Sequence, residues 1–83
     1  MAKVDKPLWA AAQQHPRHEF FVIVRTVQDA APLAEACRRE GLTVHQQYRL
    51  VPGLALTATG AAIIALAADP TVLSIEPDQE VWV

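Results

Sequence analysis

The run Phe20-Phe21-Val22-Ile23-Val24 decides the fold of this 83-residue chain. Its residues are aromatic or β-branched and none is polar, so the run predicts a β-strand. A strand that is apolar on both faces is either central in a sheet covered on both sides or has a second face that meets a partner. The sequence therefore predicts a central strand here, and its second apolar face needs an explanation.

The rest of the chain alternates between helical and extended patterns. Apolar residues at helical spacing form one stripe before Gly41, and glycine commonly follows the last residue of a helix. The dipeptide Pro52-Gly53 lies between two β-prone segments, so it predicts a hairpin turn with Gly53 at positive φ. Helices are therefore expected over residues 30–40 and 60–68, and strands over residues 20–24, 43–51, 54–59 and 72–76.

This order of elements predicts an α+β fold. Strand, helix, strand, strand, helix, strand is the order of the ferredoxin-like βαββαβ sandwich. Right-handed crossovers place both helices on one face of a four-stranded antiparallel sheet, with the first and third strands in the centre. The other face of the sheet is left open, although Ile23 and one of the two phenylalanines put apolar atoms on it.

The chain divides into residues 1–17, an N-terminal appendage, and residues 18–83, one small domain. Asp5 can cap a short helix that Pro16 ends. In a purely structural interpretation this helix covers part of the core. In a functional interpretation Trp9 contacts a partner.

Charge and cysteine content exclude several classes of protein. The net charge is −2 and the seven Lys and Arg residues form no basic run, so nucleic-acid binding is not expected. The lone Cys37 excludes an intrachain disulfide framework and is expected as a small buried side chain. The longest apolar stretch, residues 60–68, is far shorter than the roughly 20 residues that span a membrane. With no convincing signal peptide, the expected location is cytoplasmic, without membrane partners.

No constellation of residues supports catalysis. The chain has a single serine, Ser74, and no base and orienting group are placed beside it by the sequence. His15, His18 and Glu19 could ligate a metal, but a solvated polar junction is the favoured interpretation because a fourth ligand is missing. The chain is therefore expected to be a binding module, with no catalytic residue, metal or cofactor.

From Phe20 to Val81 the chain resembles the propeptide and inhibitor domain of subtilisin-like serine proteases. That family has an apolar first strand, a tyrosine on the second strand and a turn glycine before a strand of small residues, and Tyr48 and Gly53-Leu54-Ala55 match the last two features. The most specific match follows the second helix, where the family pattern is Asp-Pro-x-Val-x-x-Ile-Glu-x-Asp. Here it is Asp69-Pro70-Thr71-Val72-Leu73-Ser74-Ile75-Glu76-Pro77-Asp78.

The resemblance implies a protein inhibitor of a subtilisin-like serine protease. In the family the open sheet face docks on two surface helices of the protease. Glu76 and Asp78 resemble the two acids that cap the N-termini of those helices, whose unpaired N–H groups favour a carboxylate. The last residues, Glu80, Val81, Trp82 and Val83, resemble the segment that lies in the substrate groove as an added strand.

Two other functions remain open at this point. A chaperone-type propeptide of the same family would assist the folding of a cognate protease. A generic ferredoxin-like module would oligomerise or sense a ligand through the same open face. A free inhibitor is expected to be a monomer, and an oligomerising module a dimer.

Overall fold

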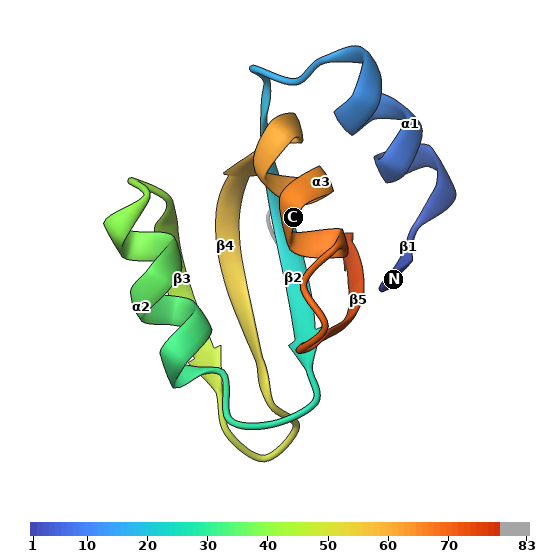
Figure 1. Ribbon diagram of the computed structural model, residues 1–83. Coiled ribbons are helices and arrows are strands. Elements are labelled where there is room, and N and C mark those ends of the chain that lie inside the picture. Colours follow the sequence, from blue (N-terminus) through green and yellow to red (C-terminus); the bar gives the residue numbers. More distant parts are fainter. Residues whose placement is uncertain (79–83) are drawn as a thin grey trace.

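The central strand of the sheet is built on the apolar run of residues 20–24, as expected. The computed structural model describes residues 1–78. They form one mixed sheet of five strands in the order β1-β5-β2-β4-β3 (Figure 1). The strands are β1 (Lys3–Val4), β2 (Glu19–Thr26), β3 (Thr43–Tyr48), β4 (Gly53–Thr59) and β5 (Val72–Pro77).

The α+β class is confirmed, but the expectation of a four-stranded antiparallel sheet is wrong. β2 pairs antiparallel with β4 and β5, and β3 pairs antiparallel with β4. The fifth strand, β1, runs parallel to β5, with Lys3 opposite Ser74 and Val4 opposite Ile75. β5 is therefore not an edge strand. A strand of two residues has no periodicity that a sequence pattern could reveal.

Three helices complete the fold: α1 (Lys6–Gln14), α2 (Ala31–Arg39) and α3 (Gly60–Ala67). The side chain of Asp5 accepts a 3.1 Å hydrogen bond from the N–H of Leu8 and caps α1. Thr59 caps α3 in the same way, accepting from the N–H of Ala62 at 3.1 Å. Within residues 1–78 no helix combines the length and apolarity needed to cross a membrane.

The core lies between the three helices and one face of the sheet. The even-numbered residues of β2 form that face, so Val22 and Val24 are fully buried beside Leu56 and Leu54 of β4. α1 contributes Leu8 to the same cluster of buried side chains. α1 therefore packs on the side of the other helices, and no helix within residues 1–78 covers the opposite face of the sheet.

The N-terminal segment is part of the fold rather than an appendage to it. The expected short helix is present, and Leu8 and Ala12 are only 6% and 0% exposed. Gly60, at the first turn of α3, lets α1 approach closely, because a Cβ there would clash with the backbone carbonyls of Ala12 and His15.

Gly53 is required for a reason other than the expected positive φ. Among the described glycines only Gly41, after α2, has a positive φ, of 85°. Gly53 lies within β4, and a Cβ there would stand 2.5 Å from the carbonyl oxygen of Val24. Close packing of the backbones of β4 and β2 therefore excludes a side chain at this position.

Candidate functional site

The sheet face that points away from the helices is a candidate binding surface. Side chains alternate along a strand, so the odd-numbered residues of β2 and their partners on the neighbouring strands share this face. We call it the open face. It consists of Phe21, Ile23 and Arg25 of β2, Ala55 and Thr57 of β4, His45 and Tyr48 of β3, and Ser74 and Glu76 of β5.

The open face is apolar near the start of β2 and cationic near its end. Phe21 is 41% exposed, and the ring centroid of His45 lies 6.0 Å from that of Phe21. The Nε2 atom of His45 lies 2.6 Å from the hydroxyl oxygen of Thr57. At the other end, the guanidinium of Arg25 lies 4.9 Å from the ring centroid of Tyr48. These contacts hold His45 and Thr57 beside the exposed ring of Phe21, and Arg25 beside Tyr48.

The two acids singled out from the sequence occupy different environments. Glu76 lies opposite Ile23 on the open face and is exposed. Asp78 follows the last residue of β5 and is only 9% exposed. Its backbone N–H donates a 2.9 Å hydrogen bond to the carbonyl of Phe21.

The structure therefore places Glu76 opposite Ile23 and Asp78, the last described residue, beside Phe21. We call residues 79–83, which follow it, the C-terminal segment. The remaining predicted contact residues lie outside the described residues. They are Glu80, Val81, Trp82 and Val83.

Residues 1–78 contain no group of three or more His, Cys, Asp or Glu side chains that could hold a metal ion. His15 and His18 make an edge contact with ring centroids 6.5 Å apart, and His18 packs against Phe20 at 4.7 Å. Burial raises the pKa of the Cys37 thiol, and the carboxylates of Glu40 and Asp69 raise it further. A thiol held in its protonated form is a poor nucleophile, so the role of Cys37 is to pack in the core.

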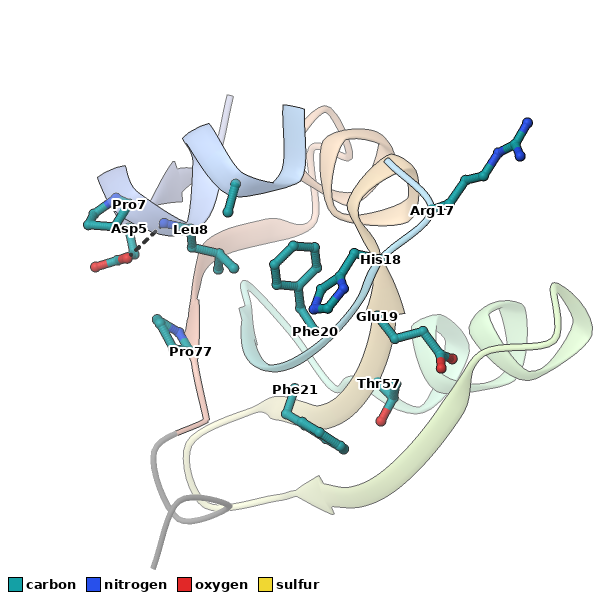
Figure 2. Close-up of a pocket in the computed structure, with 11 residues that line it drawn as sticks. Asp5, Pro7, Leu8, Arg17, His18, Glu19, Phe20, Phe21, Thr57 and Pro77 are labelled. Atoms are coloured by element: carbon teal, nitrogen blue, oxygen red, sulfur yellow. Dashed lines mark hydrogen bonds between the residues drawn. The ribbon is translucent and has the colours of Figure 1, made fainter. Parts of the chain in front are cut away.

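A cavity that the sequence did not reveal lies at the edge of the sheet. β5 ends at Pro77, opposite Val22, whereas β2 extends back to Glu19. Among residues 1–78 a notch lies beside the first residues of β2, where Leu8 borders it (Figure 2). Ala11 of α1 also lines it. We call this space, of about 740 Å³, the notch cavity. It depends on where α1 packs, which no local pattern in the sequence specifies.

Comparisons of the chain with protein-family models, with curated proteins and with solved structures found no match. The function of the chain is therefore inferred from its residues and from the geometry of the open face.

Proposed function

We propose that this protein inhibits a subtilisin-like serine protease by docking its open face on the enzyme and placing its C-terminal segment in the substrate groove. The supporting framework is the antiparallel order β5-β2-β4-β3, a ferredoxin-like arrangement to which β1 adds an edge strand. One observation carries the proposal. The uncovered, partly apolar open face and Asp78, the last residue before the C-terminal segment, meet at Phe21, whose carbonyl accepts the N–H of Asp78.

The open face suits an apolar partner surface with helix N-termini at its border. Phe21 and Ile23 supply apolar contact area that is otherwise in contact with water. Glu76, exposed beside them, has the charge that a helix N-terminus favours. Asp78 is the second acid of the proposal, and its contribution is smaller unless its side chain turns outward on binding, because it is largely buried.

The C-terminal segment is too short to bind tightly alone. About four added backbone hydrogen bonds at about 1 kcal/mol each give about 4 kcal/mol, which corresponds to millimolar affinity. Nanomolar inhibition needs about 12 kcal/mol. The open face must supply most of the difference by holding the segment at high local concentration. The intact domain is therefore a far better inhibitor than its isolated tail.

The test compares three molecules as inhibitors of a subtilisin-type enzyme. They are the full chain, a chain that ends at Gln79, and a synthetic peptide of residues 79–83. The full chain is expected to inhibit, and the other two are expected to be weaker by at least about a thousandfold, since each lacks one of two linked binding sites. Truncation without effect would show that the segment is not inserted. Absence of inhibition by the full chain would reject the proposal.

A chaperone-type propeptide is the second candidate, and independent folding separates the two. The core of this chain draws on all three helices and the sheet, which favours a domain that folds without its partner. Cooperative thermal unfolding of the isolated chain supports a free inhibitor, whereas folding only in the presence of a protease supports a chaperone. A stable dimer in light scattering, without inhibition, would instead support the oligomerising module.

A further inference from the structure

The notch cavity joins the open face to the N-terminal helix. Leu8 and Ala11 of α1 line it. In Figure 2, Phe20 of β2 points into it from the helix side of the sheet. Phe21 and Pro77 line it as well, and these residues also mark the end of the open face and the end of β5. A partner seated on the open face near Phe21 therefore also lies over the mouth of the cavity.

The residues around the cavity favour an uncharged, apolar occupant. Its walls are mostly aliphatic and aromatic side chains. The charged residues that line it are of both signs, since the carboxylates of Asp5 and Glu19 are accompanied by the guanidinium of Arg17. Asp5 is already engaged as the cap of α1, and the side chain of Arg17 points away from the cavity in Figure 2. Nothing in this arrangement selects an anion or a cation.

We propose that the notch cavity receives one aliphatic or aromatic side chain of the protease, from the surface beside its substrate groove. This inference rests on the proposed function, because the cavity and the open face are taken to meet the same partner. Its volume, about 740 Å³, lies within the roughly 300–1,000 Å³ typical of ligand sites and accommodates a large side chain. α1 then acts as a second anchor and contributes to the choice of target.

Filling the cavity from α1 tests this anchor. Ala11 lines the cavity and is half-buried, so Ala11→Phe occupies the part of the space beside α1 and Ala11→Leu occupies less of it. Ala10→Phe is the matched control, because Ala10 is exposed on the same helix and is not a lining residue. Each variant and the unmodified chain are measured for thermal unfolding and for the inhibition constant against a subtilisin-type enzyme.

Inhibition by Ala11→Phe is expected to be weaker by about tenfold or more. This is the effect expected when one apolar side chain is no longer buried at the interface. Ala11→Leu is expected to be intermediate, and Ala10→Phe to stay within about twofold of the unmodified chain. The Leu variant keeps the test valid if the Phe variant unfolds.

Each other outcome overturns the inference in a distinct way. Unchanged inhibition by both Ala11 variants would reject the anchor and leave the proposed function intact. Stronger inhibition by Ala11→Phe would show that the cavity had competed for the chain's own residues 79–83, which also rejects a protease side chain as the occupant. Absence of inhibition by the unmodified chain would reject both proposals together.

Discussion

The backbone N–H of Asp78 donates a 2.9 Å hydrogen bond to the backbone carbonyl of Phe21. Asp78 is the first residue after β5, and the side chain of Phe21 lies exposed on the open face. This bond therefore fixes the position of Asp78, the last described residue, relative to the surface proposed to dock. A fixed origin matters because a linked second contact gains most when its start is already positioned near its site.

Glu76 is expected to contribute to protease binding through its charge. Glu76→Ala should weaken inhibition, and Glu76→Ala combined with Asp78→Ala should weaken it by about 1–3 kcal/mol in total, because each carboxylate would make a charge-assisted contact. The measurement is the inhibition constant at low and at high salt. The loss should shrink at high salt, since ions screen an exposed charge.

Glu35 provides the matched control for this prediction. It is an exposed carboxylate on α2, away from the open face, so Glu35→Ala should leave the inhibition constant unchanged. Equal losses from Glu35→Ala and Glu76→Ala would point to the overall charge of the chain and would argue against a local contact.

Replacing Gly53 or Gly41 by alanine should destabilise the protein, but for different reasons. Gly53→Ala places a methyl group 2.5 Å from the carbonyl oxygen of Val24 and should lower the free energy of unfolding by about 1–3 kcal/mol, as overpacking does. Gly41→Ala meets open space but must hold a φ of 85°, which costs about 1 kcal/mol. Denaturant unfolding of both variants measures how much stability each substitution removes. A Gly53→Ala variant as stable as the parent would show that β4 can move away from β2.

Strong local patterns accounted for most of the fold. The helix expected over residues 60–68 is Gly60–Ala67, and the strand expected over residues 72–76 is Val72–Pro77. Apolar runs and the caps Asp5 and Thr59 carry this information locally. β1 was missed because its two residues become a strand only through pairing with β5.

The candidate site was predictable only in part. The unbroken apolar run of residues 20–24 was enough to expect an apolar open face, because successive side chains of a strand point to opposite faces, and Glu76 lies on that face. The burial of Asp78 and the notch cavity were not foreseen, because both depend on where β5 stops relative to β2. That relation is set by tertiary packing, which no spacing of residue types within one segment encodes.

Leu8 should be as important for stability as a residue of the central core. Its side chain is 6% exposed within the buried cluster, so Leu8→Ala should lower the free energy of unfolding by about 2–5 kcal/mol. Leu50→Ala is the matched control, because Leu50 is 100% exposed and its loss should have little effect. Similar unfolding curves for the two variants would mean that α1 does not pack stably and that residues 1–17 are an appendage after all.

The stability of the protein should fall in alkaline solution partly because of Cys37. Burial, and then the charges of Glu40 and Asp69, raise the pKa of this thiol in the folded state. The folded chain therefore holds the proton more tightly than the unfolded chain does. This contribution to stability is complete below the ordinary thiol pKa and is lost as the pH rises through the higher folded value.

Cys37→Ala removes the titrating group and keeps a small apolar side chain on the buried side of α2. Its free energy of unfolding should be lower than that of the parent near neutral pH, because of the lost sulfur contacts, and the gap should narrow as the pH rises. Iodoacetamide should label Cys37 of the parent slowly in the native state and quickly in denaturant. Parallel pH profiles together with rapid native labelling would show that the thiol is accessible and ionises freely, which its place on the buried side of α2 does not permit.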